Sequence, residues 1–280
     1  MMLDLESVRL FVLAVEFGNL TRAAEAAGTV QPAVSQRIKA LEASLGRKLL
    51  DRTPRLVRPT EAGELFLARA RALLAAHDIA IALDDAPAPT VSIGFSDHAL
   101  GTSFEQVLRR LRTALPHNTV ITLQLGQSHH VRSLFEAGTV DLAIVRREGG
   151  GADGEVLGED GIGWRAPAGW QVPDGPLPVV TLPPPCGVRA VAHKALGRAG
   201  IVWRDAFVGG SCLALVAAVR AGLGIAPLGR LVGGDLADLG PVLGLPPLPS
   251  SQIVLLSRTG TPHLATAAST LAASVRDSLR

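Results

Sequence analysis

The chain has 280 residues, 48% of them hydrophobic, and a formal net charge of +2. Its length exceeds that of a typical single domain and predicts two or three compact units. No stretch of about twenty residues lacks charged or turn residues, and the N-terminus lacks a secretory layout, so we expect a soluble, cytoplasmic protein with no membrane partner. The two cysteines, Cys186 and Cys212, exclude a disulfide framework and a structural zinc site, which leaves reduced thiols.

Positive charge is concentrated near the N-terminus rather than spread along the chain. Between positions 20 and 60 there are eight Lys or Arg residues and three Asp or Glu residues, a local charge of +5. A charge cluster alone is typical of a solvated face, and it indicates nucleic-acid binding only together with a motif.

Three short helices are predicted in this basic region. Apolar residues from Leu5 onward predict a first helix that stops at Gly18. Thr21 is the expected N-cap of a second helix over 22–27, and Gly28 suits the turn after it. A third helix begins near Pro32, and its buried face is predicted from the spacing of Val34, Ile38, Leu41 and Leu45.

The opposite face of the third helix is polar. Gln31, Ser35, Gln36 and Lys39 can offer hydrogen bonds to base edges and phosphates in a major groove, although Ser35 and Gln36 also fit a merely solvated surface. The following stretch, 49–60, alternates apolar and basic residues and predicts a two-stranded wing. Its cationic side chains suit phosphates or the minor groove, and they are Arg52, Arg55 and Arg58.

These residues carry a family resemblance. The runs TRAAEAA, QPAVSQRIKALEASLGRKLLDR and RPTEAG resemble the N-terminal domain of LysR-type transcriptional regulators over positions 5–63. The resemblance implies a winged helix-turn-helix, with DNA-contacting positions at Gln31, Pro32, Ser35, Gln36, Lys39, Arg52, Arg55 and Arg58, to which we add Thr21. Where the family usually has Ser, this chain has Val30, so either Thr29 caps the recognition helix or the helix start is looser by about 1 kcal/mol.

A long helix is expected after the winged unit, which we assign to residues 1–60. The alanine-rich stretch 61–84 contains no Pro, and Leu67, Ala70, Leu74, His77 and Ile81 form a heptad-like seam. The seam favours pairing with a second chain, and the alternative is packing on its own domain. The family resemblance also implies a homodimer, or a dimer of dimers (homotetramer), on promoter DNA. Residues 85–90, with two prolines, are expected to form a hinge.

The remaining residues, 91–280, alternate strand and helix patterns. Strands are predicted at 91–95, 120–125, 140–145, 179–182, 201–208, 224–228 and 253–257, which indicates two α/β lobes with mostly parallel sheets. The segments DLAIV and AAVRAGLGIAP resemble the effector domain of the same family, which implies a two-lobed fold like that of periplasmic binding proteins.

A cleft between such lobes would bind a small-molecule effector at strand ends and helix N-termini, where backbone N–H groups favour an anion. The expected contacts are Ser96, Asp97, Gln127, Ser128, Arg146, Gly209 and Ser211, with Arg147 as an alternative to Arg146. Each of these residues also fits a helix cap or a surface charge. A DNA-binding scaffold that responds to no ligand is the simpler alternative.

Catalysis is not expected, because the chain has no HExxH, GxSxG or phosphate-binding loop motif, and no cofactor or metal site is predicted. A redox-responsive regulator is the main alternative. The resemblance places Cys186 at the reactive cysteine of peroxide-sensing members, but Cys212 is twenty-six residues away and Ala195 stands near the expected second thiol. Promoter DNA and an effector are the expected partners, and RNA polymerase is a further one.

Overall fold

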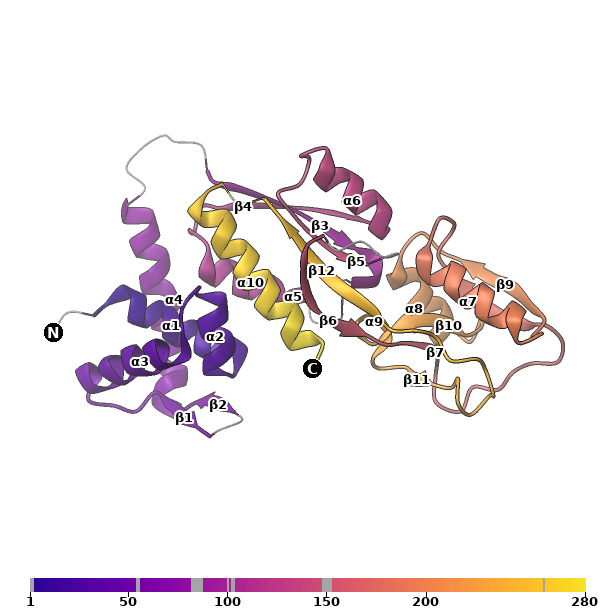
Figure 1. Ribbon diagram of the computed structural model, residues 1–280. Coiled ribbons are helices and arrows are strands. Elements are labelled where there is room, and N and C mark those ends of the chain that lie inside the picture. Colours follow the sequence, from indigo (N-terminus) through magenta and orange to yellow (C-terminus); the bar gives the residue numbers. More distant parts are fainter. Residues whose placement is uncertain are drawn as a thin grey trace.

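The computed structural model describes residues 3–53, 56–81, 88–99, 101, 104–147, 153–258 and 260–280, and the structural statements below concern these residues. Figure 1 shows a helical N-terminal unit, a central first lobe and a second lobe beside one another. The expected combination of a helical unit with two α/β lobes is confirmed. Arg55, residues 85–87 of the expected hinge and residues 149–152 of a glycine-rich stretch lie outside the described residues.

The N-terminal unit is built from three helices and a strand pair. They are α1 (Leu5–Phe17), α2 (Leu20–Ala26), α3 (Gln31–Leu45), β1 (Leu50–Arg52) and β2 (Val57–Pro59), and the two strands pair antiparallel as a wing. Phe11, Ile38 and Leu50 are fully buried in a shared core. Burial of such side chains stabilises the unit by about 1.5–3 kcal/mol each, so apolar packing positions the exposed face of α3.

One helix cap differs from its expectation, and the other bears on the two alternatives for the start of α3. Asn19 rather than Thr21 caps α2, because the Asn19 side chain accepts hydrogen bonds from the backbone N–H groups of Thr21 at 2.8 Å and Arg22 at 3.2 Å. Val30 is the N-cap residue of α3 and makes no side-chain cap bond, so Thr29 does not replace the missing Ser. The start of α3 therefore lacks a side-chain cap, and a looser start by about 1 kcal/mol stays a prediction.

Thr60 precedes helix α4 (Glu61–Ile81), and its hydroxyl accepts a hydrogen bond from the backbone N–H of Gly63 at 3.0 Å. The expected intermolecular seam is wrong in part, because Leu67, Ala70 and Leu74 are buried in the core of their own N-terminal unit. Ile81 is 62% exposed. Although α4 is long, no helix in the described part of the chain is both long and apolar enough to cross a membrane.

The first lobe contains a five-stranded sheet in the order β4-β3-β5-β12-β6. Its strands are β3 (Thr90–Ser96), β4 (Val120–Gly126), β5 (Leu142–Arg146), β6 (Glu155–Asp160) and β12 (Ser251–Ser257). Strand β3 is parallel to β4 and β5, whereas β12 is antiparallel to β5 and β6, so this sheet is mixed and not mostly parallel as expected. Helices α5 (Phe104–Ala114) and α10 (Pro262–Ser278) cover one face, and α6 (Ser128–Glu136) covers the other.

The second lobe has two small strand groups that a bridge between Val179 and Ile225 connects. Its strands are β7 (Ile162–Ala166), β8 (Leu177–Thr181), β9 (Trp203–Val208), β10 (Ala226–Gly229) and β11 (Ala237–Asp238), and its helices are α7 (Gly187–Arg198), α8 (Cys212–Arg220) and α9 (Arg230–Gly233). The chain passes between the lobes after Asp160, which ends β6, and again before Ser251, which starts β12.

The N-terminal unit lies directly against the first lobe. Helices α1 and α2 pack on α5 and α10, as Figure 1 shows. The Ser269 hydroxyl on α10 donates a hydrogen bond to the Ala26 carbonyl at 3.0 Å, and the Arg110 guanidinium on α5 lies 3.8 Å from the centre of the Phe17 ring. The two parts therefore share a packed contact in addition to their covalent connection.

Candidate functional site

Helix α3 lies on the outer side of the N-terminal unit (Figure 1), and its exposed residues are polar or cationic. Pro32, Gln36 and Lys39 are exposed, and Gln31 and Ser35 are half-buried on the same helix. Because Val34, Ile38 and Leu41 are held in the core, the polar residues between them must face outward. An amide, a hydroxyl and an ammonium group on one helix face can form hydrogen bonds with base edges and phosphates.

The wing is fastened to α3 through Glu42. One carboxylate oxygen of Glu42 accepts hydrogen bonds from the backbone N–H groups of Leu49 at 2.8 Å and Leu50 at 3.0 Å, and the other pairs with the Arg52 guanidinium at 2.7 Å. Arg52 also reaches the Ser35 hydroxyl at 3.4 Å. Arg52 is therefore held beside α3, whereas Arg58 on β2 and Thr21 on α2 are exposed.

The structure brings together three of the residues predicted to contact an effector. The Ser96 and Ser128 hydroxyl oxygens are 2.8 Å apart, and the Ser128 hydroxyl accepts a hydrogen bond from the backbone N–H of Arg146 at 3.3 Å. They meet because β3 and β5 end, and α6 begins, at the same edge of the first-lobe sheet. This edge faces the second lobe. Ser96 is 1% exposed, so this junction is a closed contact.

Arg146 is held in a buried ion pair with Asp160. Its guanidinium also donates to the Ser251 hydroxyl at 3.0 Å and to the His98 carbonyl at 3.2 Å. Residue 229 must be glycine here, because a Cβ would lie 1.9 Å from a carboxylate oxygen of Asp160. The Arg146–Asp160 ion pair, with the Arg146 bond to Ser251, thus holds both points at which the chain passes between the lobes.

His98 lies between both cysteines of the chain. Its Nε2 is 3.5 Å from the Cys186 sulfur and its Nδ1 is 3.4 Å from the Cys212 sulfur. Burial, with a smaller effect from Arg146, lowers the pKa of His98 to about 3, and burial raises the pKa of the Cys212 thiol well above its ordinary value. The imidazole is therefore neutral. The separation of the two cysteines in sequence did not indicate their distance in the fold, since both contact the His98 ring.

The other predicted effector residues are engaged in hydrogen bonds within the protein. The Gln127 side chain donates to the Pro183 carbonyl at 2.9 Å across the lobes, and Ser211 caps α8 by accepting a hydrogen bond from Ala214. The Gly209 backbone N–H donates to the Thr181 carbonyl at 3.0 Å. Asp97 accepts a hydrogen bond from the Cys212 backbone, while burial raises its pKa.

A cavity of about 520 Å³ lies between the lobes at the first turn of α7. It is lined by Arg146, Arg147, Glu159, Ile162, Gly187, Val188, Ala190, Val191, Pro249, Ser250, Ser251 and Gln252. Arg146 and Arg147 each retain a buried Nε–H group without a hydrogen-bond acceptor among the described residues. Of the positions predicted for the effector, Arg146 lines this cavity, and Arg147, the alternative cation, lines it too.

Sequence reasoning missed two residues of this junction, His98 and Asp160. His98 carries no motif in the sequence, and its neighbour Asp97 gives only an adjacent pair, a spacing unsuited to a metal. Asp160 had no detectable signal, because strands β6 and β7 on either side of it were not predicted. Helices α7 and α10 were also missed, although α7 lines the cavity and α10 contacts the N-terminal unit.

Comparisons with known proteins agree with this architecture. Residues 5–64 match the family described as "Bacterial regulatory helix-turn-helix protein, lysR family", and residues 84–280 match the "LysR substrate binding domain". The HTH-type transcriptional regulator PecT of Dickeya dadantii (strain 3937) is 32% identical, over 90% of this chain and 81% of that protein. The regulator DgdR of Burkholderia cepacia is 30% identical, over 95% of this chain and 92% of that protein.

Among solved structures, full-length LysG from Corynebacterium glutamicum with bound effector Arg is 24% identical, with a TM-score of 0.49, over 96% of this chain and 98% of that chain. The family matches and the curated relatives together span both the helical unit and the two lobes. The chain therefore belongs to the LysR family: it is a DNA-binding transcriptional regulator with an effector-binding domain, and not an enzyme.

Proposed function

We propose that α3 reads promoter DNA in the major groove, with Gln31, Pro32, Ser35, Gln36 and Lys39 at its surface and Thr21, Arg52, Arg55 and Arg58 on the flanking backbone. The observation that carries this proposal is the row of exposed polar side chains on α3 beside the exposed Arg58 of the wing. Base contacts supply sequence specificity, and phosphate contacts supply affinity and position. Arg52 acts mainly by holding the wing, because Glu42 already pairs with it.

Two substitutions separate these roles in binding titrations on a selected operator and on unrelated DNA. Gln36→Ala should reduce discrimination between them by roughly tenfold to a hundredfold. Arg58→Gln should weaken binding to both and lower the slope of log affinity against log salt by about 0.9. Arg204→Gln, which removes an exposed charge from the second lobe, is the matched control. Equal discrimination in Gln36→Ala and the parent protein would contradict the proposed reading surface.

The effector in this proposal is an organic anion bound in the 520 Å³ cavity between the lobes. The size suits a metabolite, and the cavity wall combines two guanidinium groups with apolar side chains of α7. A ligand that contacts both lobes favours the arrangement in which both contacts form. The binding free energy can in this way change how the effector domains present the DNA-binding units.

Thermal unfolding of the full chain against carboxylate metabolites tests the effector proposal. A ligand at about a hundred times its dissociation constant should add roughly 2.7 kcal/mol and raise the unfolding midpoint by several degrees. Arg147→Gln should abolish the shift, whereas Arg204→Gln should retain it. A ligand-induced shift that survives Arg147→Gln would place the ligand elsewhere.

The redox alternative through Cys186 has less physical support. Cys186 is 8% exposed and contacts the neutral imidazole of His98, which cannot stabilise a thiolate as a cation would. A parallel arm with peroxide and a thiol reductant checks it. Redox sensing would be favoured if peroxide shifts the unfolding midpoint, Cys186→Ser removes this shift, and no metabolite shifts the midpoint.

The proposed assembly is a homodimer, or a dimer of dimers, on two half-sites. Leu67, Ala70 and Leu74 are used within one chain, so pairing through α4 would require another side of that helix. Leu65 is 62% exposed and Leu73 is 37% exposed, and these apolar side chains are available for it. Sedimentation of Leu65→Glu against Glu64→Gln, a conservative change of the neighbouring exposed residue, tests this face.

A further inference from the structure

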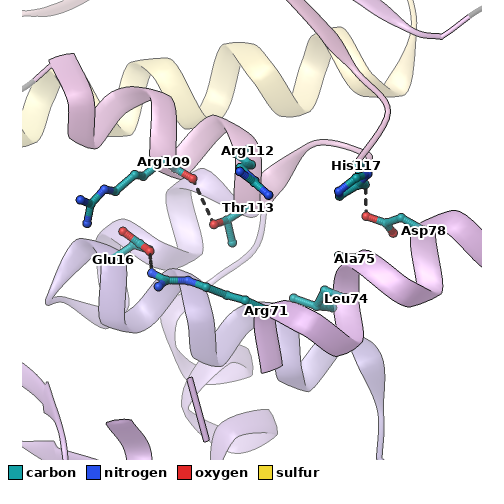
Figure 2. Close-up of a pocket in the computed structure, with 9 residues that line it drawn as sticks. All are labelled: Glu16, Arg71, Leu74, Ala75, Asp78, Arg109, Arg112, Thr113 and His117. Carbon is teal, nitrogen blue, oxygen red and sulfur yellow. Dashed lines mark hydrogen bonds and ion pairs between the residues drawn. The ribbon is translucent and has the colours of Figure 1, made fainter. Parts of the chain in front are cut away.

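A second cavity, of about 470 Å³, lies where the N-terminal unit, the linker helix and the first lobe meet. Its walls come from α1 through Glu16, from α4 through Arg71 and from α5 through Arg112 (Figure 2). None of its lining residues belongs to the interlobe cavity. It is therefore a separate site, and its position connects the DNA-binding unit to the effector-binding domain.

The walls of this cavity are held together by direct contacts between the three parts. The Arg9 guanidinium on α1 donates to the Thr113 carbonyl at 3.1 Å and to the Asp78 carboxylate at 3.4 Å. The Arg110 guanidinium on α5 donates to the Glu16 carbonyl at 3.0 Å. The cavity exists only while these parts are docked.

Both acidic side chains at the cavity are already engaged. Glu16 forms an ion pair with Arg71, and Asp78 pairs with Arg9 and accepts a hydrogen bond from the His117 backbone N–H at 3.2 Å. The exposed Arg112 side chain, by contrast, has neither an ion pair nor a hydrogen bond within the described residues. The cavity thus presents a guanidinium group that no acid neutralises.

Arg109 is a second cation at the cavity, although Glu105 pairs with it. Arg109 pairs with Glu105 only at an exposed position, where the two side chains are 62% and 78% exposed. Such a pair contributes little, so Arg109 can turn to another anion at small cost. Figure 2 shows Arg112 and His117 above the cavity, opposite Leu74 and Ala75 on α4. The guanidinium groups of Arg109 and Arg112, together with the apolar side chains on α4 between the ion-paired Arg71 and Asp78, suit a small organic anion.

We propose that this cavity binds an organic anion of metabolite size, through a carboxylate or phosphate group on Arg112 and Arg109. Guanidinium groups bind either group with charge-assisted hydrogen bonds, and the volume suits a small metabolite. Because the cavity requires docked units, the bound anion favours the docked arrangement. The site would therefore act on the position of α3 relative to the effector domain, independently of the interlobe ligand.

Thermal unfolding and calorimetric titration of the full chain test this proposal with two probes, inorganic phosphate and citrate, against sodium chloride at equal ionic strength. We expect at least one probe to raise the midpoint beyond chloride, and the arms identify which anionic group is preferred. Arg112→Gln should weaken binding by about tenfold or more. Arg69→Gln removes an exposed charge from α4 outside the cavity and should bind as the parent does.

Two outcomes overturn the proposal. If neither probe raises the midpoint beyond chloride, the cavity binds no such anion. If the rise is the same in Arg112→Gln, the anion binds elsewhere, for example at the DNA-binding surface. Arg147→Gln separates this site from the interlobe cavity, because Arg147 lines that cavity alone: the part of the rise that Arg112→Gln removes should persist in Arg147→Gln. Hydrogen exchange supplies the structural readout: the probe should slow exchange in α1 and α5, and unchanged exchange there would contradict docking.

Discussion

The Arg110 guanidinium on α5 donates a hydrogen bond of 2.6 Å to the Asp277 carboxylate near the end of α10. The other carboxylate oxygen of Asp277 pairs with Arg22 on α2. One carboxylate therefore joins the helix-turn-helix to two helices of the first lobe. Arg110 has a 2% exposed side chain, and burial lowers its pKa to about 10. Removal of its partner would leave a charge in a poorly solvated place.

Asp277→Asn should lower the free energy of unfolding by about 2 kcal/mol, because Arg110 and Arg22 lose their shared counter-charge. We place the expected loss below that of a fully buried pair, since the Asp277 side chain is 17% exposed. Urea unfolding followed by circular dichroism measures it. Glu105→Gln, at the exposed Arg109 pair, should change stability by less than about 0.5 kcal/mol. Equal effects of the two variants would contradict the joining role of Asp277.

His98 should make stability depend on pH. Its pKa is about 3 in the folded protein against an ordinary value of 6.5, so the unfolded chain binds a proton that the folded chain does not. The contribution of neutral His98 to the free energy of unfolding is fully present above pH 6.5 and is lost as the pH falls toward 3. Between pH 6.5 and about 5 this amounts to about 2 kcal/mol of stability.

Urea midpoints of the parent protein and His98→Gln over this pH range check the effect. The variant should be less stable near neutral pH and should show a shallower decline on acidification. Asp97 acts in the opposite direction, because its raised pKa favours the protonated folded state, but it is present in both proteins. Parallel pH curves for the two proteins would contradict a neutral buried His98.

Asp160→Asn should destabilise the effector domain by about 3–5 kcal/mol, because it leaves the buried Arg146 charge without its partner. Both side chains are almost fully buried, at 2% and 0% exposure. Thermal unfolding of the full chain measures the loss. Glu159→Gln, one residue away and exposed, should be nearly neutral, and an equally large loss there would show that the strand and not the ion pair is responsible.

Val30→Ser should stabilise the N-terminal unit by about 1 kcal/mol, because a serine hydroxyl at the N-cap of α3 can accept a hydrogen bond from a first-turn N–H. Val30 makes no such bond and is 64% exposed. Val30→Ala tests removal of the apolar side chain alone and should give no gain. Equal stability of the serine and alanine variants in urea would contradict the capping argument.

The local elements were predictable where short-range rules decide them. Gly18 and Gly46 end α1 and α3 in the left-handed region, and the spacing of Val34, Ile38 and Leu41 gave the buried face of α3. The cap of α2 was wrong because Asn19 and Thr21 are both good capping residues, and the choice depends on where the preceding turn leaves the chain.

Long-range relations were not predictable from the same signals. The seam at Leu67, Ala70 and Leu74 has the spacing of an intermolecular contact, but periodicity gives the apolar face and not the partner that covers it. Likewise, His98, Cys186 and Cys212 come from three separate segments. The contacts among these three residues depend on how the two lobes pack together, which no local sequence pattern predicts.

Strand β12 lies between β5 and β6, so residues 251–257 complete a sheet that begins at Thr90. During synthesis the first four strands of this sheet leave the ribosome well before the strand that separates two of them. Until then β5 and β6 each present an open edge, which is a site for wrong pairing. Assembly of the first lobe, and with it the surface of α10 on which the DNA-binding unit packs, is thus postponed until residues 251–278 have been synthesised.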